Sequence, residues 1–218
     1  MRALVVHCHP SPDSFTAAVR DVVVSRLAAG GAEVEVLDLY AEKFDPVLCR
    51  DGWGAYEQVP ANRAAVEAHA AAVRRAETLV FVYPTWWYGP PAMLKGWLER
   101  VLLPGVAFSN PAEGPIRPGL THVRRLGVFT TCGASRWLTW IVGAPGRRTL
   151  LRGLRLNCHA RCRTAYAAHY SMDSSTAESR ARHLRLAAAT ADRLLRAPRR
   201  RAEVSAGAEE AGPAGAAA

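Results

Sequence analysis

The sequence predicts an α/β protein built on a doubly wound, five-stranded parallel sheet with helices on both faces. Short apolar runs and longer stretches of helical character alternate along the chain in five successive repeats. This order favours parallel strands joined by right-handed helical crossovers. Most of the apolar runs are continuous, which fits strands that are buried on both faces.

The first repeat begins at the amino terminus. Residues 2–9, RALVVHCH, form a valine-rich run expected to be a buried strand. Residues 16–31 follow as a helix, with Asp13 or Ser14 available to cap its start and two glycines to end it. Residues 32–40, AEVEVLDLY, alternate in the manner of a strand.

The middle of the chain continues the alternation. Residues 61–77 are rich in alanine and are expected to form a helix, and residues 78–84, TLVFVYP, form the next apolar strand. Residues 91–102, PAMLKGWLERVL, follow as a helix whose first turn suits Pro91.

The last repeats complete the expected sheet. A strand is expected within 122–133, a helix over 147–156, a strand over 162–170 and a capped amphipathic helix over 175–196. We therefore expect one domain over residues 1–197. Residues 198–218 are rich in Ala, Gly and Glu and are expected to be a disordered tail.

The composition limits the class of protein. The chain has 218 residues, half of them hydrophobic and 22% charged, which indicates a globular protein. No apolar run approaches the ~18 residues of a membrane span, so no integral membrane segment is expected. Because His7 and His9 interrupt the first apolar run, we expect no secretory signal and a cytoplasmic location.

The five cysteines predict neither disulfides nor a metal site. An odd number of widely spaced cysteines favours reduced thiols. Cys158 and Cys162 lie close together, but the sequence offers no second pair of ligands to complete a zinc site. We therefore expect no bound metal.

The net charge of +9 comes almost entirely from arginine. Either the genome's composition favours arginine, or the surface attracts anionic partners. No nucleic-acid-binding module is present, so we expect no nucleic-acid partner. The arginines of residues 147–155 either form a solvated helix face or attract the phosphates of a nucleotide.

Three connections after predicted strands contain the candidate site, because open parallel sheets bind ligands beyond the carboxyl ends of their strands. The first connection joins a strand to a helix start and carries His9, Ser14 and Thr16, a combination that suits a phosphate. It lacks the glycines of the common nucleotide loops. It could equally be no more than a capped helix start.

The second connection carries Trp86, Trp87 and Tyr88 where small polar residues are usual. These aromatics either wall a site for a planar ring or cover an interface. The third connection, TTCGAS, places Gly133 where backbone could approach a ligand closely, although an ordinary turn also explains it. A planar ring and a phosphate at adjacent strand ends together suggest a flavin nucleotide.

The sequence resembles the flavodoxin-like NAD(P)H:quinone oxidoreductase family, which includes DT-diaphorase and bacterial quinone reductases. Four blocks carry the resemblance in the family's order: ALVVHCHPSPDSFTAA, DLYAEKFDPVL, YPTWWYGPPAMLKGWLERVLLPGVAF and IRPGLTHVRRLGVFTTCGAS. They span residues 2–135, and the third is the most specific. The resemblance implies a flavodoxin-like flavin-binding domain.

The resemblance also implies which residues bind the cofactor. His9, Ser14, Phe15 and Thr16 match the flavin phosphate loop of the family. The residues that match its ring-contacting loops are Pro84, Thr85, Trp86, Trp87, Tyr88, Thr130, Thr131, Cys132 and Gly133. The family's tyrosine and histidine, thought to assist hydride transfer, correspond to Leu138 and Ala144, neither of which transfers protons.

The resemblance implies a flavin-bound homodimer that reduces quinones or similar aromatic acceptors by two electrons. We expect ping-pong kinetics, in which NAD(P)H reduces the flavin before the acceptor binds. The flavin is FAD or FMN, and the segment 49–62 is a candidate for the extra room that FAD needs. Alternatives are an azo-, nitro- or tailoring reductase, an electron carrier, and a regulatory flavoprotein subunit of an ion-efflux system.

Overall fold

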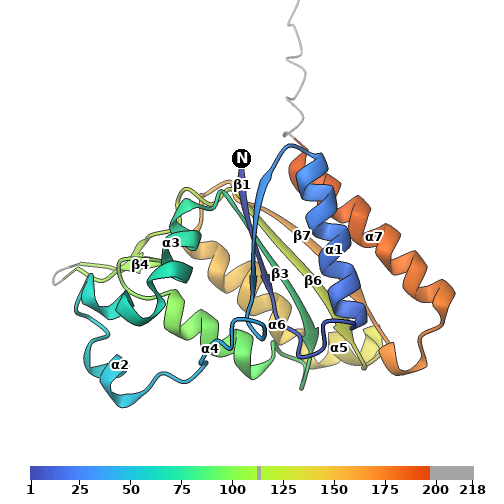
Figure 1. Cartoon of the computed structure of the whole chain (residues 1–218), viewed down its shortest axis with the longest axis horizontal. Helices are drawn as coiled ribbons and strands as arrows, with labels where there is room; N and C mark the ends of the chain where they lie inside the picture. Colours follow the sequence, from blue (N-terminus) through green and yellow to red (C-terminus); the bar gives the residue numbers. More distant parts are fainter. Residues whose placement is uncertain (112–113, 197–218) are drawn as a thin grey trace, which may run out of the picture.

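The computed structural model describes residues 1–111 and 114–196, so the expected tail at 198–218 lies outside the described residues. Five parallel strands form a central sheet in the order β2-β1-β3-β6-β7 (Figure 1). The strands are β1 (Arg2–His7), β2 (Glu33–Asp38), β3 (Thr78–Thr85), β6 (Arg125–Cys132) and β7 (Arg163–His169). The expected parallel α/β fold is confirmed.

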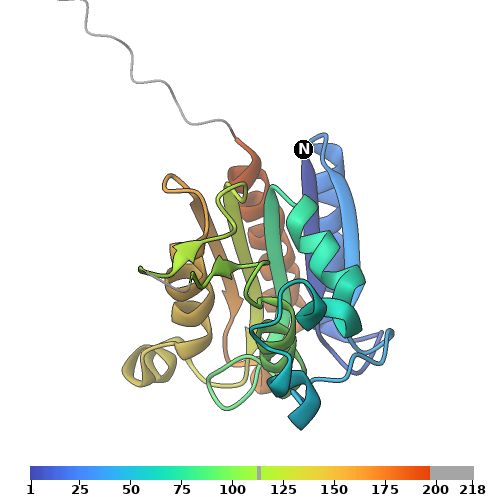
Figure 2. The same ribbon diagram turned by 90° about the vertical axis from the view of Figure 1, so that its left-hand side faces the viewer.

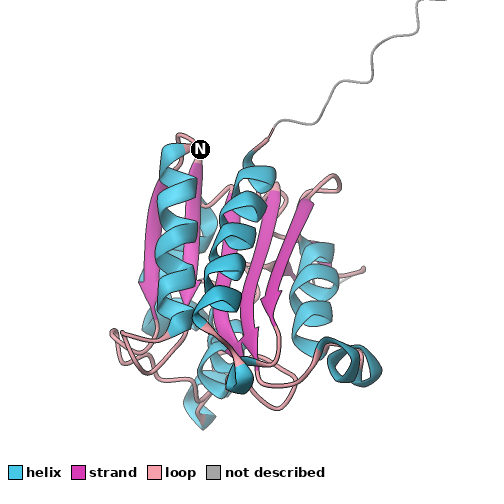
Figure 3. Ribbon diagram, turned by 90° about the vertical axis from the view of Figure 1, so that its right-hand side faces the viewer, coloured by secondary structure: helices cyan, strands magenta, loops and turns pink. Residues whose placement is uncertain are grey.

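Helices cover both faces of this sheet. Helices α1 (Phe15–Ala29) and α7 (Ala177–Leu195) lie side by side on one face (Figure 3). Helices α3 (Glu67–Arg75) and α4 (Ala92–Val101) cover the opposite face, together with a helical segment that starts at α6 (Pro145–Arg148) (Figure 2).

Alternate side chains of the strands supply two hydrophobic cores. Val5 and Val82 point to the face of α1 and α7, where Leu27 packs against them. On the other face Phe81 meets Trp97 of α4 edge to face, with ring centroids 6.1 Å apart. Because both cores need continuous apolar strands, the valine-rich pattern of the sequence is explained.

The strand order places the switch point between β1 and β3. The chain moves from β1 outward to β2, then returns to the other side of β1 to form β3. His7 pairs with Val82, so the connections that leave β1 and β3 start side by side. Ligands of doubly wound sheets bind at such a point.

Several elements differ from the expectation. The helix expected at 61–77 is a 3-10 segment, η1 (Ala61–Val66), followed by α3, because the Asn62 side chain donates to the Tyr56 and Pro104 carbonyls and holds this segment against two loops. The expected helix at 147–156 changes form, from α6 to a π turn, η2 (Thr149–Gly153), and a 3-10 segment, η3 (Leu154–Asn157).

Other elements had no signal in the sequence. These are the short helices α2 (Arg50–Gly54), α5 (Arg136–Val142) and η4 (Met172–Ser174), and the small strands β4 (Phe108–Ser109) and β5 (Arg117–Pro118). In α5 only Thr139 is buried, so its apolar residues show no core-facing period. No helix among residues 1–111 and 114–196 has the length and apolar character needed to cross a membrane.

Candidate functional site

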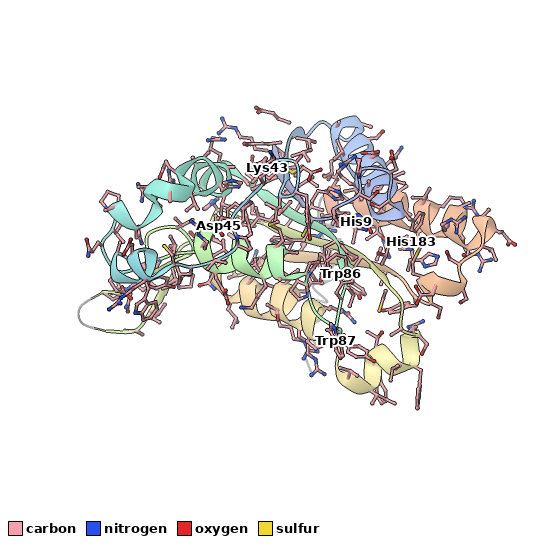
Figure 4. All side chains as sticks on the ribbon, turned by 60° about the horizontal axis from the view of Figure 1, so that its bottom comes forward. His9, Lys43, Asp45, Trp86, Trp87 and His183 are labelled. Atoms are coloured by element: carbon pink, nitrogen blue, oxygen red, sulfur yellow. The ribbon has the colours of Figure 1, made fainter. Side chains whose placement is uncertain are left out.

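A pocket of about 940 Å³ opens at the carboxyl ends of β1, β3 and β6. It brings together residues from all three expected connections. The lining residues are His9, Pro84, Thr85, Trp86, Trp87, Tyr88, Thr131, Cys132, Gly133, Ala134, Leu138, Met172 and Asp173. Four expected site residues, Ser14, Phe15, Thr16 and Thr130, are not part of its lining. Figure 4 shows His9, Trp86 and Trp87 along this end of the sheet.

The second connection is a tight hairpin that extends β3. Trp86 and Gly89 exchange backbone hydrogen bonds of 3.1 and 3.0 Å. Between them Trp87 and Tyr88 adopt left-handed backbone conformations, with φ of 48° and 62°. Such hairpin turns favour glycine or asparagine, and each larger residue costs roughly 1–2 kcal/mol there. Backbone strain of this kind concentrates at functional sites.

The hairpin leaves groups available to a ligand. The amides of Trp87 and Tyr88 donate to no acceptor among the described residues. The Trp87 side chain is 96% exposed, and Trp86 stands beside His9 with ring centroids 6.4 Å apart. Amide donors and aromatic faces therefore border the same pocket.

Two pairs of threonine hydroxyls tie the three connections together. Thr16 Oγ1 lies 3.0 Å from Thr131 Oγ1, which joins the first connection to the third. Thr85 Oγ1 lies 2.8 Å from Thr130 Oγ1, which joins the second to the third. Thr16 and Thr130 thus stand behind the lining residues and fix their spacing.

The first connection has the geometry of an anion site. Ser14 is the N-cap of α1, because its Oγ accepts from the Ala17 amide at 3.1 Å. The Phe15 and Thr16 amides belong to the first turn, where helix N–H groups have no helical acceptor. Ser11 holds the His9 ring through Nδ1, at 3.0 Å from the amide nitrogen, and leaves Nε2 for other contacts.

Phe15 faces away from the pocket, into a cluster with two histidines. Its ring centroid lies 5.4 Å from that of His169 and 5.9 Å from that of His183. Burial lowers the pKa of His183 to about 4 and also lowers the pKa of His169. This cluster of neutral rings supports the helix start from behind, which the sequence pattern alone did not indicate.

Asp173 is a pocket residue that the sequence reasoning missed. Its Oδ2 lies 2.9 Å from the position that a Cβ on Gly133 would occupy, so a side chain at Gly133 would displace the Asp173 carboxylate. Met172 and Asp173 follow β7, the fourth strand to end beside the pocket. The rule that pointed to the other three connections would have found them.

The two residues that correspond to the family's tyrosine and histidine, Leu138 and Ala144, lie apart. Leu138 lines the pocket, whereas Ala144 lines a neighbouring groove and has a φ of 48°. The side chains of the lining that can ionise are His9, Tyr88, Cys132 and Asp173. The buried Cys8 behind the pocket has its pKa raised to about 12 by burial, so it stays a neutral thiol.

The pocket and the start of α1 beside it fit a flavin. The free amides of Phe15 and Thr16 suit a phosphate, and the hairpin amides suit the polar edge of a planar ring. The pocket of about 940 Å³ leaves room for such a ring between the hairpin and the third connection. The donor set offers no grouping for metal chemistry, since residues 1–111 and 114–196 contain no cluster of three His, Cys, Asp or Glu side chains.

This fold and this site define a flavodoxin-like protein. A family model described as "Flavodoxin-like fold" matches residues 1–194, and the chain belongs to that family. The family expected from the sequence blocks is thus confirmed.

Among curated proteins, the chain is similar to "NAD(P)H dehydrogenase [quinone] 1" of Cavia porcellus, with 37% identity over 135 residues that cover 53% of this chain and 49% of that protein. It is also similar to "Ribosyldihydronicotinamide dehydrogenase [quinone]" of Rattus norvegicus, with 33% identity covering 63% of this chain and 66% of that protein. The chain thus spans about half to two thirds of the length of these relatives.

Among solved structures, the chain is similar to Smu.1420 from Streptococcus mutans UA159. The TM-score is 0.76 and the identity 28%, and the match covers 88% of this chain and 100% of that one.

Proposed function

We propose that this chain is a flavin-dependent NAD(P)H oxidoreductase that reduces quinones or similar aromatic acceptors by a ping-pong mechanism. One observation carries the proposal. The three connections that resemble the quinone reductase family converge on one pocket and are tied to each other by the two threonine pairs. The names of the curated relatives support the same activity.

The residues of the chain bind and orient in this proposal. The Phe15 and Thr16 amides hold the flavin phosphate, and Ser14 fixes the helix start. The amides of Trp87, Tyr88 and Gly133 stabilise negative charge at the edge of the ring. A bound flavin would supply two-electron transfer between the nicotinamide and the acceptor.

The exposed aromatics shape the space above the ring. Trp86, Trp87 and Leu138 all line the pocket. Because leucine and alanine stand where the family has its tyrosine and histidine, protons come from solvent through the open mouth of the pocket. The exposed indoles favour flat acceptors that can lie against them.

We also propose a homodimer that forms through α5. Trp137, Leu138 and Ile141 are exposed on this helix, at 69%, 37% and 52%. Exposed apolar patches of this kind mark interfaces, and this one borders the pocket. Sedimentation equilibrium of wild-type protein and of Ile141→Glu tests it: a dimer that becomes a monomer supports the proposal, and a monomeric wild type contradicts it.

Reconstitution tests the activity. Purified protein is incubated with FMN or FAD, and the retained cofactor is identified by absorbance and mass. Initial rates of NADPH oxidation with menadione are then measured over both substrate concentrations, with flavin-free protein as the control. We expect one flavin to be retained and parallel double-reciprocal lines.

The other outcomes separate the alternatives. Turnover of azo or nitro compounds without turnover of menadione favours the azo- or nitroreductase. Flavin retention with activity only in the presence of a membrane partner favours the regulatory subunit. Protein that retains neither flavin after reconstitution contradicts the proposal as a whole.

A further inference from the structure

A groove rich in arginine lies beside the flavin pocket, on the other side of α5. It has a volume of about 330 Å³ and runs between α5 and the helical segment that starts at α6. We call it the arginine groove, and its charged and aromatic residues are Trp140, Arg147, Arg148 and Arg152. None of them has a role in the function proposed above.

The positive charge of this groove is not compensated by the rest of the described chain. Some other arginines of the described chain have an acidic neighbour, as in the pairs of Arg20 with Asp38, Arg26 with Asp192 and Arg75 with Glu35. Within residues 1–111 and 114–196, no such ion pair includes Arg147, Arg148 or Arg152. Three adjacent guanidinium groups without carboxylates favour an anionic ligand over a merely solvated helix face.

Two of the arginines are held in place. The Arg147 guanidinium lies 4.8 Å from the centre of the Tyr166 ring. Arg148 lies against Gly143, where a Cβ would come within 3.0 Å of its Nη1. Gly143 has a φ of 89°, so a turn that favours glycine also makes room for this guanidinium. Arginines held in this way lose less freedom when they bind phosphate oxygens.

The groove also offers an aromatic surface. Trp140 is 76% exposed and stands in its wall. A purine base can stack on an exposed indole, and such stacking depends little on which base is present. The combination of stacking surface and arginines matches a nucleotide better than it matches a simple anion.

The groove and the flavin pocket are neighbours. Leu138 lines the pocket and Trp140, two residues further along α5, lines the groove. The Gly146 amide, at the start of α6, donates to the carbonyl of Tyr88 in the hairpin at 3.5 Å. A seven-residue helix is about 10 Å long, so one dinucleotide can reach from the pocket past α5 to the groove.

We propose that the arginine groove binds the adenosine end of NADPH. Trp140 stacks on the adenine, while Arg147, Arg148 and Arg152 bind the 2′-phosphate and the pyrophosphate. The nicotinamide then lies in the flavin pocket, and the chain prefers NADPH to NADH. This inference rests on the proposed function for the role of the nicotinamide, but it concerns atoms of the cofactor that the flavin does not touch.

The first test uses a ligand that lacks nicotinamide. Adenosine 2′,5′-bisphosphate is titrated calorimetrically into the full chain, with flavin-saturated and flavin-free samples. We expect binding in both samples. In the variant Arg147→Ser/Arg148→Ser the affinity should be lower by a factor of about ten or more. The matched control is Arg182→Ser/Arg185→Ser, which removes the same charge from exposed positions on α7 and should retain the wild-type affinity.

The second test uses the holoenzyme. In Arg147→Ser/Arg148→Ser the ratio of kcat/KM for NADPH to that for NADH should fall about tenfold, through KM for NADPH. Trp140→Ala should raise KM for both cofactors equally, because both contain adenine.

Three results overturn the inference: no binding of the bisphosphate, equal affinity in the groove and control variants, or capture by the groove of an acidic peptide such as oligoglutamate but not of the bisphosphate. Binding of the bisphosphate by a chain that retains no flavin would support the groove and contradict the proposed function. Flavin-dependent turnover without binding of the bisphosphate would support the proposed function and contradict the inference about the arginine groove.

Discussion

His183 should make the protein less stable as the pH falls from neutral toward 4. This residue is 4% exposed, on α7 between Phe15 and His169, and its Nε2 has no hydrogen-bond partner among the described residues. Burial lowers its pKa from 6.5 to about 4, and the nearby His169 adds to this effect. The folded protein therefore holds this ring neutral where the unfolded chain would protonate it.

The magnitude follows from the difference between the two pKa values. Between pH 6.5 and pH 4 the unfolded state binds a proton that the folded state does not. The free energy of unfolding therefore decreases as the pH is lowered through this range. The full difference between 6.5 and about 4 corresponds to roughly 3 kcal/mol. Between pH 7 and pH 5 His183 alone should account for a loss of about 2 kcal/mol.

Urea unfolding of wild type and His183→Phe measures this loss. The buried His7, whose pKa is also lowered to about 4 by burial, contributes equally to both proteins and cancels in the comparison. We expect the wild type to lose about 2 kcal/mol relative to the variant between pH 7 and pH 5. Arg185→Gln, an exposed change on the same helix, should follow the wild type. Parallel pH profiles for wild type and His183→Phe would refute the reasoning.

Three further substitutions test the packing and the site. Gly96→Ala should lower the free energy of unfolding by about 3 kcal/mol, because the new Cβ would lie 2.1 Å from the Pro46 carbonyl oxygen; an unchanged melting temperature would contradict this. Trp87→Gly should raise stability by about 1 kcal/mol by removing left-handed strain, while KM for menadione rises; a less stable variant would show that the turn is not strained. Thr16→Val should cost about 1–2 kcal/mol and weaken flavin binding, because Thr131 loses its hydroxyl partner; an unchanged urea midpoint and flavin affinity would count against it.

The sequence predicts the sheet and its main helices because their signals are local. Valine-rich runs such as 78–84 are buried on both faces, and the burial leaves a continuous apolar pattern. Helix α5 shows the opposite case, since its tryptophans face solvent and give no such pattern. The break between η1 and α3 depends on Asn62 bonding to the distant Pro104 carbonyl, a contact 42 positions along the chain that local propensity cannot contain.

The candidate site was predictable where strand ends carry unusual residues, and unpredictable where tertiary contacts decide. Trp86 and Gly133 stand out in the sequence and line the pocket, and Asp173 would have been found by applying the same rule to the end of β7. Phe15 and His183 pack together although they lie 168 positions apart in the sequence (183 − 15). A local sequence pattern cannot indicate such a contact. The arginines of the groove were visible as charge, but only the structure shows them without acidic neighbours.

The pocket draws on nearly the whole length of the chain, from His9 to Asp173. During synthesis His9 emerges from the ribosome early, whereas Met172 and Asp173 emerge only after most of the protein has been made. A nascent chain arrested before residue 172 therefore has His9 and the hairpin but lacks the side of the pocket that Met172 and Asp173 supply. In the described chain only α7 follows these residues, so a ligand that fits the pocket selects chains that have nearly completed the fold over shorter ones.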